Sequence, residues 1–154
     1  MQFLLDLCVV FGTATAILLH QKLIFRLLPL AELVRTKPLP PGAGYWIEGT
    51  AREELQFRAA LIGVPMLMGA DPYVVGACAL AGSVWFGLTH PYPRRTQMLL
   101  FGVAGLAIAG VFVFEASRYN VLAGFAASFS VHLLLNVWRQ YRLWRRERLI
   151  QASV

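Results

Sequence analysis

The sequence predicts an all-α protein, a polytopic membrane helix bundle with about five transmembrane helices plus interfacial helical segments. Of the 154 residues, 58% are hydrophobic and 14% are charged, whereas soluble domains carry about 25% charged residues. No apolar stretch alternates polar and apolar residues, as a strand of a membrane barrel would. The expected membrane spans are residues 2–19, 55–70, 72–89, 98–114 and 121–137.

The first expected span is a retained helix rather than a signal peptide. It has no positively charged start, it contains Asp6, and it shows no clear cleavage site. The segment that follows is amphipathic, with Lys22 and Arg26 among leucines, so it either extends the first helix or lies in the headgroup plane. The prolines at positions 38, 40 and 41 would end any helix there.

The chain is expected to be one membrane domain over residues 1–154. Residues 1–37 form its N-terminal helix and interfacial segment, residues 50–138 its motif-bearing core, and residues 139–154 a basic cytoplasmic tail. The tail mixes Trp138, Tyr141 and Trp144 with arginines, which is typical of an interfacial helix on anionic lipid. Cys8 and Cys78 lie inside expected spans without metal-ligand spacing, so we interpret both as packing residues.

The basic residues predict a topology. With five spans and an external N-terminus, every basic cluster falls on one face, and the positive-inside rule makes that face cytoplasmic. The two links on the other face contain a single basic residue, Arg118. This distribution favours a lipid bilayer, rather than nucleic acid, as the partner of the formal charge of +6. The cytoplasmic clusters are Lys22, Arg26, Arg35, Lys37 and Arg52, then Arg94 and Arg95, then Arg139, Arg142, Arg145, Arg146 and Arg148.

Polar residues from three expected spans share one depth. Charged groups within a bilayer are costly, so an ionisable group there is a functional hypothesis. On the predicted cytoplasmic side, the second span begins with two carboxylates and an arginine, the third ends at a histidine, and the fifth carries a histidine and an amide. These residues are Glu53, Glu54, Arg58, His90, His132 and Asn136.

Spacing within these spans predicts which side chains face each other. Glu54 and Arg58 are i and i+4 with the acid first, which favours an ion pair. Glu53 points about 100° away around the helix and is left free. His132 and Asn136 are also i and i+4, so they share one helical face.

A glutamate and a histidine that share a water can perform general base catalysis. A second histidine with an asparagine one turn away can donate hydrogen bonds to a developing oxyanion. GxSxG, SxxK and HExxH motifs are all lacking. These residues therefore indicate hydrolysis of an amide by activated water.

Three stretches carry a family resemblance: "EELQFR" fits EExxxR, "FGLTH" fits FxxxH from Phe86 to His90, and "HLLLN" fits HxxxN. Over residues 50 to 138 the chain resembles the CPBP family of glutamic intramembrane proteases, which includes the type II CAAX prenyl endopeptidases and bacterial Abi-like proteins. The resemblance implies a metal-independent enzyme without a cofactor. It also implies roles: Glu53 and His90 activate the water, His132 and Asn136 stabilise the oxyanion, and Glu54 and Arg58 support the site, with Glu54 able to assist.

The expected substrate is a membrane-anchored protein or peptide, processed at a CAAX-type end or at a C-terminal sorting signal. The expected location is a bacterial inner membrane with the basic C-terminus cytoplasmic. Two alternatives stay open. Glu53, His90 and His132 could ligate zinc in a zinc-dependent membrane protease, or the polar cluster could bind a peptide or lipid in a non-catalytic immunity or scaffold protein.

Overall fold

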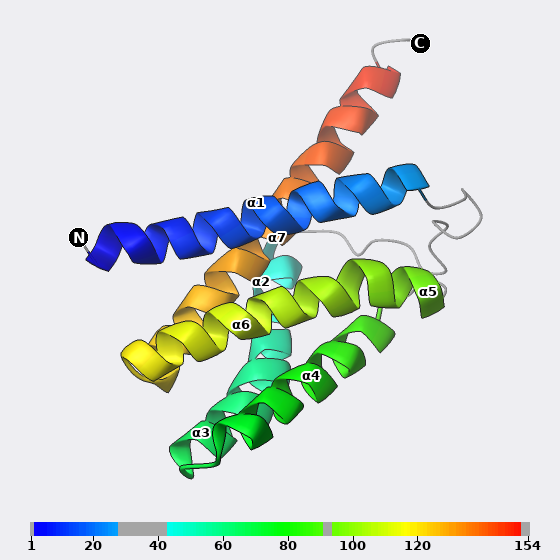
Figure 1. The fold of residues 1–154 in the computed structure, drawn as a ribbon. Helices are drawn as coiled ribbons and strands as arrows, with labels where there is room; N and C mark the ends of the chain where they lie inside the picture. The colour runs from blue at the N-terminus through cyan, green and yellow to red at the C-terminus, as the bar shows by residue number, and fades with distance from the viewer. Residues whose placement is uncertain (1, 28–42, 91–93, 152–154) are drawn as a thin grey trace.

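The computed structural model describes residues 2–27, 43–90 and 94–151, and within those ranges every regular element is a helix. The expected all-α fold is confirmed (Figure 1). Two of the elements are π-helical stretches that continue directly into α-helices. In chain order the elements are α1 (Gln2–Leu27), α2 (Ala43–Glu54), a π-helical stretch (Leu55–Gly63), α3 (Val64–Leu67), α4 (Pro72–Leu88), α5 (Arg94–Thr96), a second π-helical stretch (Gln97–Gly102), α6 (Val103–Arg118) and α7 (Val121–Gln151).

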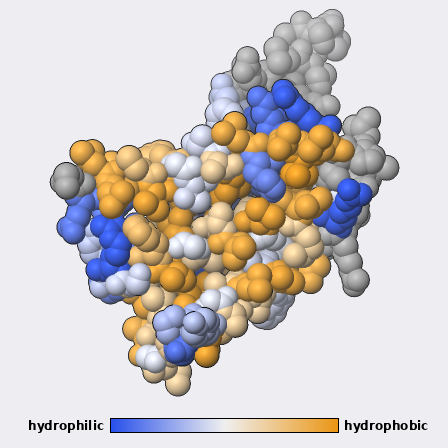
Figure 2. Space-filling view, viewed as in Figure 1, coloured by the Kyte–Doolittle hydropathy of each residue, from blue (hydrophilic) through white to orange (hydrophobic). Residues whose placement is uncertain are grey.

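Among the described residues, three helical stretches are long and apolar enough to cross a membrane: Gln2–Ile24, Met98–Arg118 and Val121–Arg139. The apolar helix α4 is shorter, with 17 residues. Residues 55–67 of the expected span 55–70 form the second half of a continuous rod made of α2, the first π-helical stretch and α3, and residues 68–70 form the turn that follows it. Figure 2 shows hydrophobic residues over most of the visible face, with hydrophilic residues gathered at its edges. The membrane-helix character of the chain is therefore confirmed.

The α6 helix is the centre of the bundle. In its most apolar window 56% of the residues are buried, against 11% for the peripheral helix α1. One side of α6 packs on α1 and α7, where Ile108 meets Ile17 and Val131. Its other side packs on α4 and the first π-helical stretch, where Phe112 meets Ile62. Four elements are thereby held around one helix.

Two short turns connect neighbouring helices at the end of the bundle opposite the polar layer. Gly69 has φ +72°, a left-handed conformation that glycine adopts without strain, and it follows α3. Asp71 then accepts a hydrogen bond of 2.7 Å from the backbone N–H of Tyr73 and caps α4. Asn120 accepts in the same way from Ala123 at 2.9 Å, which starts α7.

Two helices are longer than the spans expected from hydrophobicity. The α1 helix continues to Leu27, so the beginning of the amphipathic segment extends the first helix. Residues 28–42, which include the rest of that segment and the prolines at positions 38, 40 and 41, lie outside the described residues. The α7 helix runs to Gln151 without a break, so the basic tail continues the last span and projects beyond the bundle (Figure 1).

A polar cluster ties α1 to the end of α6, away from the expected site. Arg118 donates to Asp6 at 2.8 Å, and the Tyr119 hydroxyl donates to the other Asp6 oxygen at 3.0 Å. Glu115 lies 3.8 Å from the same arginine. Asp6, Glu115 and Arg118 thus form one charge cluster between these two helices.

Candidate active site

The two expected carboxylates are the last residues of α2, where the helix changes its hydrogen-bond pattern. In the following stretch the backbone N–H of Val64 bonds to Ala59, five residues earlier, so the helix is wider than an α-helix. Such π-helical segments occur frequently at functional sites. Glu54 and Arg58 still face each other, with 3.5 Å between Oε1 and Nη1. The structure thus contains the ion pair that the spacing predicts.

Glu54 also contacts His132 of α7, and this contact sets the protonation of the imidazole. The Nδ1 atom of His132 lies 2.9 Å from Oε1 of Glu54. Glu54 is fully buried and His132 is 5% exposed, so water does not compete for this bond. An ionised carboxylate can only accept, so Nδ1 carries the proton, and in the neutral ring Nε2 is the acceptor.

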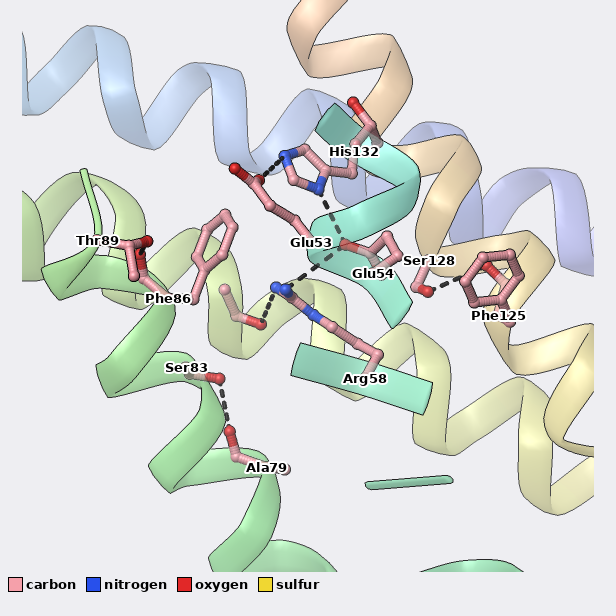
Figure 3. Close-up of polar contacts among 12 residues, drawn as sticks. Glu53, Glu54, Arg58, Ala79, Ser83, Phe86, Thr89, Phe125, Ser128 and His132 are labelled. Atoms are coloured by element: carbon pink, nitrogen blue, oxygen red, sulfur yellow. Dashed lines mark hydrogen bonds and ion pairs between the residues drawn. The ribbon is translucent and has the colours of Figure 1, made fainter. Parts of the chain in front are cut away.

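Glu53 contacts the other nitrogen of the same ring. Its Oε2 lies 3.3 Å from Nε2 of His132, so the two glutamates flank one imidazole (Figure 3). A carboxylate and an imidazole nitrogen at this distance can pass a proton between them. The Glu53 side chain is 37% exposed, whereas that of Glu54 is buried. Glu53 is therefore the carboxylate that a reactant can approach.

Arg58 holds the buried side of the site through three contacts. Besides Glu54, its guanidinium donates to the carbonyl of Gly105 at 3.2 Å and lies over the Phe86 ring, 4.5 Å from the centroid. A Cβ at Gly105 would come within 2.9 Å of the Phe86 ring, so glycine permits this close approach of α6. The arginine therefore links α2, α4 and α6 behind the two glutamates.

His90 lies on the far side of Phe86. Its Nδ1 is 2.9 Å from the carbonyl oxygen of Phe86, and since a carbonyl only accepts, Nδ1 is the donor. The imidazole stacks on Phe101 at 3.8 Å. The Phe86 ring makes edge contacts with both His90 and His132, at 4.7 and 5.4 Å between centroids. The structure thus brings Glu53 to His132, while the pairing of Glu53 with His90 stays a prediction.

Asn136 has a partner that the sequence did not reveal. Its amide nitrogen donates to the hydroxyl of Thr50 at 2.8 Å, and that hydroxyl donates to the carbonyl of Trp46 at 2.6 Å. Thr50 is 1% exposed. It precedes Glu54 by one helical turn on the same face, and this spacing could have identified it.

Chemically, the site is a chain of carboxylate, imidazole and carboxylate in which the outer carboxylate is accessible. Such a chain can take a proton from water and return it to a leaving group. Among the described residues no group of three His, Cys, Asp or Glu side chains is arranged to hold a metal ion. No protein-family model, curated protein or solved structure matches this chain.

Proposed function

We propose that this protein is an intramembrane glutamic endopeptidase of the CPBP type, which hydrolyses a peptide bond of a membrane-anchored protein or peptide. The observation that carries the proposal is the pair of glutamates on opposite nitrogens of His132, at 2.9 and 3.3 Å. A purely structural ion pair needs one carboxylate. The second one, Glu53, is left exposed beside a ring whose tautomer Glu54 determines, which is the arrangement that a general base requires.

In the proposed reaction Glu53 takes a proton from a water molecule, and the water oxygen attacks the carbonyl carbon of the scissile bond. The proton passes to Nε2 of His132, which then becomes a donor and, with Asn136, can hydrogen-bond to the oxyanion. When the C–N bond breaks, the same proton moves to the leaving amine. His90 lies across the Phe86 ring from His132, and in the proposal it orients the water or the substrate from that side.

The basic clusters place the site at the cytoplasmic edge of the membrane in this proposal. Positive-inside bias puts the basic end of α7 in the cytoplasm, and His132 and Asn136 lie in the half of the apolar span Val121–Arg139 that is next to that end. A bacterial inner membrane is the proposed location. The substrate would be a short membrane-anchored peptide or tail, either CAAX-type or with a C-terminal sorting signal.

The proposal is tested in liposomes that contain the purified protein and one of two fluorogenic reporters. One reporter is a farnesylated peptide with a CAAX end, and the other is a single apolar helix with a basic C-terminal tail. We expect cleavage of at least one reporter by the wild type. Glu53→Gln should lower the rate by at least about 100-fold, since it removes the base but keeps the shape.

The matched control is Glu48→Gln, because Glu48 lies on the same helix and its side chain is 72% exposed. This variant should cleave at the wild-type rate. Insertion of all variants into the liposomes is checked by protease protection of the C-terminal tail. Cleavage by Glu53→Gln at the wild-type rate would refute the proposal, as would a wild type that cleaves neither reporter.

A further inference from the structure

Two helices face each other through matching polar stripes. Thr50 and Glu54 are one turn apart on α2, and Asn136 and His132 are one turn apart on α7. The pairs join in order, Thr50 with Asn136 at 2.8 Å and Glu54 with His132 at 2.9 Å. The numbering rises on one helix as it falls on the other, so the helices run antiparallel at this contact. We call these two pairs the polar ladder.

The hydroxyl of Thr50 determines which way the Asn136 amide faces. A hydroxyl has one proton, and the Thr50 proton lies in the 2.6 Å bond to the carbonyl of Trp46. The oxygen can therefore only accept from Asn136, which must present its nitrogen rather than its carbonyl oxygen. Thr50 is buried, so water does not replace it readily. The amide is held in one of its two orientations.

A fixed amide matters for the proposed chemistry, and the inference rests on the proposed function. One N–H of Asn136 is used by Thr50, which leaves one N–H and the carbonyl oxygen. A rotation of the amide by 180° would exchange donor and acceptor and would replace the remaining donor with an oxygen. An oxyanion would then meet an acceptor, which is repulsive.

We infer that Thr50 is a positioning residue of the site, which acts through Asn136 by locking the carboxamide in the orientation that donates to the substrate. In the other pair of the polar ladder, one turn further along α2, Glu54 sets the tautomer of His132. His132 and Asn136 of α7 are thus each oriented by one buried residue of α2. Of these two α2 residues, only Glu54 belongs to one of the motifs.

The first test needs no substrate. Asn120 and Asn136 are the only asparagines of the chain, so asparagine-specific ¹⁵N labelling gives two carboxamide signals, which Asn136→Gln assigns. In the wild type, one Asn136 proton should exchange with deuterium at least about 10-fold more slowly than those of the exposed Asn120, as expected for a buried hydrogen bond. A rapidly exchanging Asn136 carboxamide would overturn the inference without any variant.

The second test uses Thr50→Val, which keeps the shape and removes the hydroxyl, with Thr50→Ala in case valine prevents folding. The Asn136 carboxamide should lose its protection from exchange. On the cleaved reporter, kcat should fall about 10-fold while KM changes by less than about twofold, because one hydrogen bond is lost in the transition state. Thr50→Ser should restore both. The control is Ser130→Ala, because Ser130 makes the same bond to the carbonyl four residues earlier, at 2.7 Å, and should leave both readouts unchanged.

The outcomes separate this inference from the proposed function. If Thr50→Val loses Asn136 protection but keeps full kcat, Thr50 orients an amide that the reaction does not use, and the inference fails. If neither Thr50→Val nor Thr50→Ala folds, the residue is structural and the positioning role fails as well. If Glu53→Gln cleaves normally, the proposed function fails, while the exchange measurement still decides whether Thr50 holds the amide.

Discussion

Replacement of Arg58 by methionine tests whether the buried charges form one unit. Arg58 is 1% exposed, and the variant leaves Glu54 buried without its cation. Removal of one partner from a buried ion pair costs about 3 to 5 kcal/mol. The bond from His132 to Glu54 at 2.9 Å survives and compensates part of the charge, so we expect the low end, about 3 kcal/mol. That is a large fraction of the roughly 5 to 15 kcal/mol that stabilises a typical protein.

The measurement is equilibrium unfolding in mixed micelles, and the chain provides a matched control. Glu48 and Arg52 form an ion pair with the same i, i+4 spacing, but both side chains are more than 70% exposed. Arg52→Met should therefore change the free energy of unfolding by less than about 1 kcal/mol.

A double variant separates the lost charge partner from lost packing. Glu54→Gln combined with Arg58→Met removes both charges, and it should be more stable than Arg58→Met alone by at least about 1 kcal/mol. If Arg58→Met costs no more than Arg52→Met, or if the double variant is additive within about 0.5 kcal/mol, the buried pair is not coupled and the reasoning is wrong.

Three glycines give further predictions. In Gly105→Ala the new Cβ would lie 2.9 Å from the Phe86 ring. We expect the free energy of unfolding to fall by about 1 to 3 kcal/mol and reporter cleavage to slow. If neither changes, the ring has room to move. In Gly124→Ala the Cβ would lie 2.6 Å from the backbone oxygen of Phe112, so the packing of α7 on α6 should weaken by about 1 to 3 kcal/mol or more. At Gly110 nothing lies within 4 Å, so alanine there should stabilise the protein by up to about 1 kcal/mol. The same sign for Gly124→Ala and Gly110→Ala in thermal unfolding would contradict the packing described.

The sequence predicts correctly those features that depend on a single helix. The length of the apolar stretches predicts the helical bundle. The i, i+4 spacing predicts that Glu54 faces Arg58 and that His132 and Asn136 share a face. These are local properties, because the helical period alone brings residues at i and i+4 together. The shared depth of the polar residues also predicts that they lie close together, since charges in a bilayer are tolerated only where they are paired. Glu54 does contact Arg58 and His132.

The partners across helices could not be predicted from spacing. Whether Glu53 meets His90 or His132 depends on how α2 crosses α7, and the wider turns after Glu54 alter the phase of that helix in a way that hydrophobic periodicity does not reveal. The expected span boundaries also assumed regular α-helices. Thr50 was missed because a threonine in a helix is ordinary by composition, and its spacing from Glu54 does not show which residue of α7 it meets.

The polar ladder explains how a hydrophobic helix bundle accommodates several polar side chains at one level along its helices. A buried carboxylate or imidazole costs free energy when one of its polar atoms lacks a hydrogen-bond partner. A polar side chain that can rotate does not present a fixed donor or acceptor. For His132 and Asn136 of α7 both problems have one solution, since each is paired with a residue of α2 that can only accept from it. The pairing that stabilises the helix contact therefore also selects the tautomer of His132 and the orientation of Asn136. Glu53 is the exception: it contacts Nε2 of His132 at 3.3 Å but stays 37% exposed, and the proposed function gives this accessible carboxylate its role.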